Sequence, residues 1–144
     1  MSEYVDYSRF ILKTKAVKQA VALTAATELL RIASECQKAV DRNLSGDQIN
    51  PNVSGAEDDR IGTMPVPRRT GNLSRALTWT KVSSLFHAIW MNPQIAPYAK
   101  WVHWGTKKMR PRRFMSDVIS SRGPAWSNQL KYKLILAIRN VGQR

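Results

Sequence analysis

Apolar positions recur at helical spacing along the first third of the 144-residue chain. Residues 9–45 contain no proline or glycine, and charged side chains lie off the apolar stripe. Asn43, Ser45 and Gly46 then supply a stop signal. A helix of about 30 residues would be ~45 Å long, so we expect part of it to pack on a neighbouring subunit. The stripe consists of Val17, Val21, Ala25, Leu29, Ile32, Cys36 and Val40.

The segment 46–69 has no sustained hydrophobic period. It contains three prolines and three glycines, which favour turns. A connection of this length in a small domain is uncommon and usually functional, so we expect either an arm that orders against a neighbour or a surface loop without a role. A short helical turn should follow, with Thr70 or Asn72 as its cap. Its apolar residues are Leu73, Ala76 and Leu77.

Between Leu77 and Met91 the period changes from helical to alternating. β-Branched and aromatic residues occupy many of these positions, which is typical of strands. We therefore predict two antiparallel strands, joined by a turn near Ser83 and Ser84.

In the last third of the chain, the spacing of apolar residues predicts helices again. Residues 98–104 can form a short helix or turn, with Gly105 as its left-handed stop. After Pro111, apolar spacing predicts two helical segments, which Gly123-Pro124 is expected to separate. The fold class is α+β, with the long N-terminal helix and the C-terminal helix packed on a small antiparallel β-sheet. We expect residues 1–144 to form a single domain.

Charge divides the chain into two parts. Residues 1–59 contain seven Lys/Arg and nine Asp/Glu, whereas residues 60–144 contain sixteen Lys/Arg and only Asp117 as an acid. The net charges are therefore −2 and +15. A basic field of this strength is expected to attract nucleic acid, an anionic membrane surface or an acidic protein face. A basic surface that serves solubility alone is the other interpretation.

Residue patterns for catalysis or metal binding are missing from the sequence. Cys36 is the only cysteine, and His87 and His103 do not fall in a zinc-binding pattern. Phosphate-binding loops and nucleophile motifs do not occur, so we expect no enzyme, no metal and no cofactor. The sequence also contains no long apolar run and no signal-peptide pattern. These observations predict a protein made and kept in a cytoplasm.

The stretch 98–115, YAKWVHWGTKKMRPRRFM, combines six basic residues with two tryptophans. Its cations could neutralise phosphates, and Trp101 and Trp104 could stack on bases. Because these tryptophans are three residues apart, they could equally belong to the core or to an interface. A peripheral membrane role ranks below both, since no strongly amphipathic basic helix is evident. The candidate polyanion-binding or interface residues are Arg68, Arg69, Lys107, Lys108, Arg110, Arg112 and Arg113.

Two ordered motifs resemble those of the tail-completion, or head–tail joining, proteins of tailed bacteriophages. The first is PRRTGNLSRAL at 67–77, and the second is the 98–115 stretch before the last helix. His103 stands where this family usually has Glu, and Arg112-Arg113 separates Pro111 from Phe114 where the family usually has a contiguous RPF. The matching residues are Thr70, Gly71, Asn72, Leu73, Tyr98, Ala99, Val102, Gly105, Thr106, Met109, Pro111 and Phe114.

The resemblance implies a structural virion protein of the phage neck. Copies of such a protein form a ring, six in number by family analogy, that lets DNA pass. The implied partners are the chain itself, head-closure or connector proteins on one side, and tail terminator or tail tube proteins on the other. Tyr98, Val102 and Phe114 are expected to anchor the core. The alternative interpretation is a basic nucleic-acid-binding protein.

Overall fold

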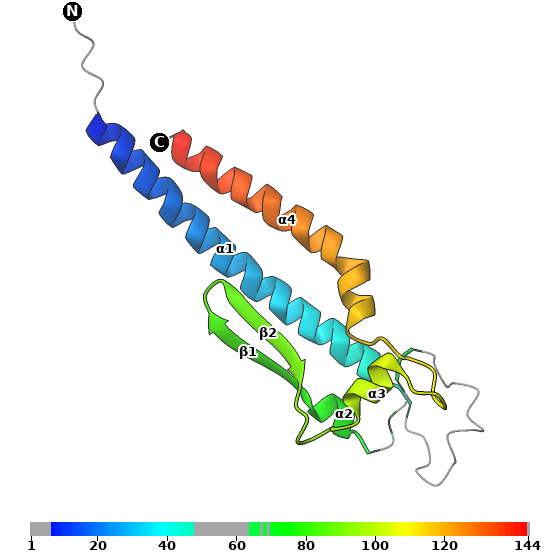
Figure 1. Cartoon of the computed structure of the whole chain (residues 1–144). Helices are drawn as coiled ribbons and strands as arrows, with labels where there is room; N and C mark the ends of the chain where they lie inside the picture. The colour runs from blue at the N-terminus through cyan, green and yellow to red at the C-terminus, as the bar shows by residue number, and fades with distance from the viewer. Residues whose placement is uncertain (1–6, 48–63, 67, 69, 144) are drawn as a thin grey trace, which may run out of the picture.

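The computed structural model describes residues 7–47, 64–66, 68 and 70–143. Two long helices pack with a two-stranded antiparallel sheet (Figure 1), which confirms the α+β prediction. The predicted long N-terminal helix is also confirmed. In chain order the elements are α1 (Tyr7–Leu44), α2 (Asn72–Arg75), β1 (Leu77–Ser83), β2 (Phe86–Met91), α3 (Ala99–Trp104) and α4 (Ser116–Gly142).

Helix α1 is the central element of the fold. The hairpin of β1 and β2 packs on one side of α1, and α4 runs antiparallel along another side (Figure 1). With 38 residues, α1 is about 57 Å long. A compact domain of 144 residues has a radius of gyration of only about 15 Å. The helix pair therefore extends well beyond a compact core.

The main core lies at the C-terminal end of α1. Its fully buried side chains with the largest volumes are Phe114, Leu44 and Val40. Val118 and Trp126 of α4 belong to the same cluster. The core therefore packs the first half of α4 against the C-terminal end of α1. A smaller cluster consists of Ala76, Ala96 and Ala99.

The hairpin has the two antiparallel strands that the sequence predicts. Leu77 pairs with Met91 and Thr80 with Ala88, and the register shifts between Lys81 and Ser83. The turn falls at residues 84–85. Leu77 and Met91 pack against the main core, so the open end of the hairpin is anchored and its turn end is not.

The predicted break at Gly123-Pro124 is wrong, because α4 is one helix from Ser116 to Gly142 with Pro124 inside it. Proline removes the N–H that would bond the carbonyl four residues earlier, which is that of Ser120. Ser120 is exposed, so water can bond this carbonyl. Val118 and Trp126 are buried in one core on either side of the proline, and this packing holds both halves in one bent helix (Figure 1).

Most of the expected arm at 46–69 lies outside the described residues. Its two ends are held together, because Gly46 donates a backbone hydrogen bond to Val66 (3.1 Å) and Arg68 donates one to Asp47 (3.0 Å). Val66 is also buried in the main core. The arm's ordering against a neighbour stays a prediction. Among the described residues, no helix is both long enough and apolar enough to cross a bilayer.

Candidate interaction surface

The connection from α3 to α4 is fixed by Gly105 and Pro111. Helix α3 ends before Gly105, as expected, but the expected left-handed conformation is wrong, because Gly105 combines φ 78° with ψ 177°. A Cβ on Gly105 would lie 2.8 Å from both the Met109 carbonyl oxygen and the Pro111 nitrogen. The chain therefore folds back on itself at a point where only glycine fits. Thr106 donates its backbone N–H to Met109 (2.9 Å), and Arg112 donates one to Val102 (2.9 Å).

Phe114 is the anchor of this connection in the core. It is 1% exposed, and its carbonyl accepts a hydrogen bond from Asn43 Nδ2 of α1 (3.0 Å). The ring meets His103 edge to face at 4.9 Å. Val102 packs on the main core and Tyr98 on the smaller cluster, each only partly buried.

The TGNL motif joins α1 to the hairpin through α2. Gly71 is the N-cap of α2, with φ 77°, in place of the expected Thr70 or Asn72. Thr70 Oγ1 accepts only a long hydrogen bond from the Asn72 N–H, at 3.4 Å. Leu73 packs against both clusters, and Ser74 Oγ donates to Asp41 Oδ1 of α1 (2.8 Å). These residues position elements rather than reacting groups.

The basic residues singled out in the sequence differ in exposure and in contacts, and Arg68 is exposed as well as hydrogen-bonded. Lys107, Lys108, Arg110 and Arg113 are all exposed on the connection before α4, so they are available to an anionic partner. Arg112 is half-buried. Arg68 is held at the end of α1, where its Nε donates to the Gly46 carbonyl (3.1 Å). Arg69 lies outside the described residues.

Trp101 and Trp104 are surface residues, so the expectation that they belong to the core is wrong. They are 49% and 65% exposed, because α3 turns its Ala99 and His103 inward instead. The Lys100 ammonium lies 5.2 Å from the Trp101 ring centroid, a cation–π distance. The interface interpretation of these two residues stays a prediction.

A groove of about 420 Å³ lies between the end of β2 and α3, and its lining is mostly apolar. Sequence reasoning did not find it, because its residues come from separate segments. The one feature of the sequence that could have indicated the groove is the cluster of Trp90, Pro93 and Pro97 just before the 98–115 stretch. We name it the tryptophan groove, and it is lined by residues 89–91, Pro93, 96–97, 99–100, 103–104 and 114–115.

His103 lies in the wall of the tryptophan groove. It is 7% exposed, and its Nε2 shares a 2.8 Å hydrogen bond with Ser116 Oγ. Its Nδ1 has no hydrogen-bond partner among the described residues. Burial lowers the pKa of His103, Asp117 raises it less, and Arg113 lowers it further. A neutral imidazole therefore lines the groove at neutral pH.

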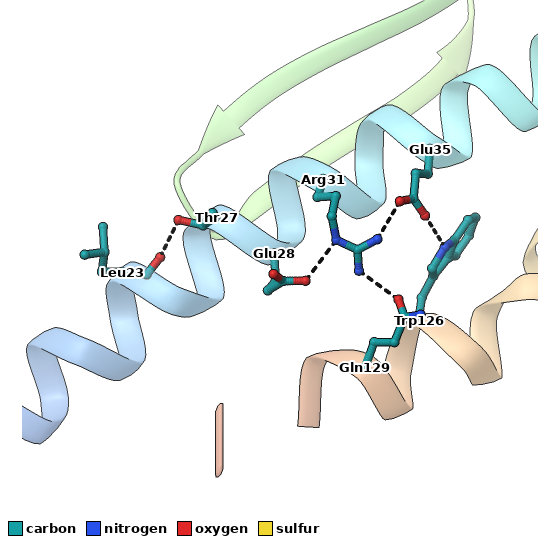
Figure 2. Close-up of polar contacts among 7 residues, drawn as sticks. All are labelled: Leu23, Thr27, Glu28, Arg31, Glu35, Trp126 and Gln129. Carbon is teal, nitrogen blue, oxygen red and sulfur yellow. Dashed lines mark hydrogen bonds and ion pairs between the residues drawn. The ribbon is translucent and has the colours of Figure 1, made fainter. Parts of the chain in front are cut away.

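The structure also contains a polar network that the sequence analysis missed. Arg31 of α1 bonds Glu28 (3.0 Å) and Glu35 on its own helix and Gln129 of α4 (2.9 Å), as Figure 2 shows. Glu35 also accepts a hydrogen bond from Trp126 Nε1 of α4 at 2.8 Å (Figure 2). The contacts within α1 could have been predicted, because its charged residues are spaced three and four positions apart. The contacts with α4 could not, because they depend on how the two helices pair.

The Trp126 hydrogen bond is the largest cause that lowers the pKa of Glu35, followed by the Arg31 hydrogen bond. Both contacts favour the carboxylate over the neutral acid. This network orients α4 on α1 and has no reactive group.

Two features of the described residues bear on metal binding and on nucleophilic chemistry. Within those ranges, no group of three His, Cys, Asp or Glu side chains comes together to hold a metal ion. Burial raises the pKa of the half-buried Cys36 thiol, so this cysteine is a poor nucleophile at neutral pH.

Comparisons of the chain with protein-family models, with curated proteins and with solved structures found no match.

Proposed function

We propose that the chain is a structural subunit of the neck of a tailed bacteriophage, where copies form a ring that joins the DNA-filled head to the tail. The observation that carries this proposal is the ordered motif set, together with what its residues do in the fold. Gly105 permits a close backbone approach, Phe114 anchors the core, and Gly71 starts α2. The motif residues therefore determine how the chain folds, which is the role expected of motif residues in a structural protein.

Exposed apolar surface supports an assembly role. Large apolar side chains in four separate regions face solvent, whereas monomeric proteins rarely expose extended apolar patches. A ring subunit would bury such surface against its neighbours. The residues are Leu23 and Leu30 of α1, Val82, Leu85, Phe86 and Trp90 of the hairpin, Ile95, Trp101 and Trp104 around α3, and Ile119, Tyr132, Ile135 and Ile138 of α4.

The partners follow from the same proposal. Head-closure or connector proteins would lie on one side of the ring, and tail terminator or tail tube proteins on the other. Lys107, Lys108, Arg110 and Arg113 are exposed and would fasten onto acidic faces of these neighbours. Contact between some of these cations and the passing DNA is a secondary role.

Genetic depletion tests the joining function. Cells infected with a phage that lacks the gene should accumulate filled heads and separate tails, and adding the purified protein to the lysate should restore infectious particles. An Arg110→Glu/Arg113→Glu variant should restore fewer, because the cations face acidic neighbours in the proposal. Joined, infectious particles made without the protein would refute the proposal.

Nucleic-acid binding is the second candidate, because Trp101 and Trp104 are exposed close to the four exposed cations of the connection. A salt titration of oligonucleotide binding separates the two. If the isolated chain binds DNA through these cations, the logarithm of its association constant should fall by about 0.9 per phosphate contact for each unit of log salt concentration. Weak binding at physiological salt would leave the neck proposal as the better account.

A further inference from the structure

The tryptophan groove has the size and lining of a binding site. Its volume of about 420 Å³ falls within the range of roughly 300–1,000 Å³ that is usual for ligand pockets. Within the part of the chain that the structure describes, Lys100 and His103 are the only ionisable residues of its lining. Met91 and Met115 line it too, and methionines adapt to side chains of different shape. The floor of the groove therefore selects an apolar group.

The surroundings of the groove are basic. Lys100 lies in the lining and is exposed. Lys107 and Lys108 follow the lining residue Trp104 within four positions, and Arg113 directly precedes the lining residue Phe114. Among the described residues, no carboxylate lines the groove. The acid that influences His103 is Asp117. This charge distribution favours a ligand whose apolar group is flanked by carboxylates.

His103 offers a groove ligand no open ring nitrogen. Its Nδ1 is buried from solvent, and its Nε2 shares a hydrogen bond with Ser116 Oγ. A ligand would therefore be held by the apolar lining and by the surrounding cations.

We propose that the tryptophan groove binds a short acidic segment of a partner protein, which inserts one apolar side chain between Trp90 and Trp104. The proposal deepens the proposed function, on which it rests for the identity of the partner as a neighbour in the assembly. The groove itself can be tested on the isolated chain.

A second copy of the chain and nucleic acid both fit the groove less well. Most described carboxylates are already engaged within the chain: Glu28 and Glu35 bond Arg31, and Asp41 accepts from Ser74. Single-stranded nucleic acid needs cations along its whole path and open aromatic faces. Here the groove floor is apolar, and Lys100 is the one Lys or Arg among the described residues of its lining.

The test is a selection from a random library of peptides of about 12 residues displayed on yeast, with the biotinylated full-length chain as bait. The enriched peptides should carry a Leu, Ile, Met, Phe or Trp flanked by Asp or Glu. One of them is then synthesised with a fluorescein label and its affinity measured by anisotropy. Replacing its apolar anchor by Ser should weaken binding about tenfold, the loss typical of a truncated hot spot.

Matched variants locate the binding to the groove. Trp104→Ala and Lys100→Glu should each weaken the peptide's affinity about tenfold. Tyr132→Ala is the control for the first, because Tyr132 is an exposed aromatic residue of α4 and does not line the groove. Lys131→Glu is the control for the second, since it makes the same charge change on α4. Both controls should change the affinity less than about threefold.

Three results would overturn the inference: no enrichment beyond a Trp104→Ala bait, enriched peptides without acidic residues, or equal binding by the groove variants and their controls. Displacement of the peptide by an oligothymidylate, with the same sensitivity to Trp104→Ala, would assign the groove to nucleic acid instead. The unfolding temperature of each variant shows that it is folded. Failure here leaves the depletion experiment unaffected, and failure of joining leaves the peptide result standing.

Discussion

At the scale of single residues, Gly71 and Gly105 share a positive φ but differ in their surroundings. A Cβ on Gly71 would meet nothing within 4 Å, whereas one on Gly105 would press against two backbone atoms. We expect Gly71→Ala to cost about 1 kcal/mol of unfolding free energy, from φ strain alone. Gly105→Ala should cost about 3 kcal/mol, because its φ and ψ fall where glycine is nearly obligatory. Urea unfolding of both variants measures this difference, and equal losses would contradict it.

Glu35 should make stability depend on pH. Its pKa in the folded chain lies below its usual value of 4.5, mainly through the Trp126 hydrogen bond and then through Arg31. The stabilisation is therefore present above pH 4.5 and is lost as the pH falls through the lower folded-state pKa. Because the side chain is 42% exposed, the contribution should be at most about 1 kcal/mol.

Thermal unfolding between pH 3 and pH 7 tests this prediction. The Glu35→Gln variant should lose less stability on acidification than the native chain does, whereas Asp47→Asn, a control away from the helix pair, should behave like the native chain. The same acid response in Glu35→Gln as in the native chain would show that the Trp126 contact does not select the carboxylate.

Single residues also show where reasoning from sequence stops. Phe114 and Gly105 were identifiable, because a motif and a turn requirement single them out. The exposed state of Trp101 and Trp104 was not identifiable, since three-residue spacing places two side chains on one side of a helix without saying which side faces the core. The unpartnered nitrogen of His103 depends on Ser116 and Phe114, and no spacing rule predicts these contacts.

At the scale of elements, the buried side chains of α1 lie in its C-terminal half, among the residues 13–44 whose side chains the structure describes. Leu44 is 1% exposed and Leu23 is 72% exposed, although both belong to this helix. Leu44→Ala should therefore destabilise the fold by about 2–5 kcal/mol, while Leu23→Ala should change stability by no more than about 0.5 kcal/mol. Guanidinium unfolding of the two variants measures both values. A large loss for Leu23→Ala in the monomer would mean that the face of α1 that carries Leu23 is packed.

Elements with a clear hydrophobic period could be predicted from the sequence, whereas the continuity of α4 through Gly123-Pro124 could not. The spacing of apolar residues along α1 and the alternation in the hairpin reflect local geometry, so both could be read directly. The Gly123-Pro124 pair is a local breaker, but Val118 and Trp126 pack into one core on either side of it. Tertiary packing overrides local propensity there, and a single sequence does not display that packing.

At the scale of the whole molecule, the main core lies at one end of α1, and many large apolar side chains elsewhere face solvent. Val82 and Phe86 at the hairpin turn are 60% and 58% exposed. A Val82→Thr/Phe86→Thr variant keeps good strand formers and should unfold at the same temperature as the native chain. In particle assembly it should enter rings poorly, because these residues would lie between subunits. Lys81→Thr, on the same strand, is the control, and normal incorporation of the double variant would exclude the hairpin turn from the ring interface.

The most direct test of the neck assignment is to count and locate the chain in purified phage particles, by quantitative mass spectrometry and immunogold labelling. We predict a small, ring-like number of copies per particle, labelled at the junction of head and tail. Absence of the chain from finished, infectious particles would contradict the assignment.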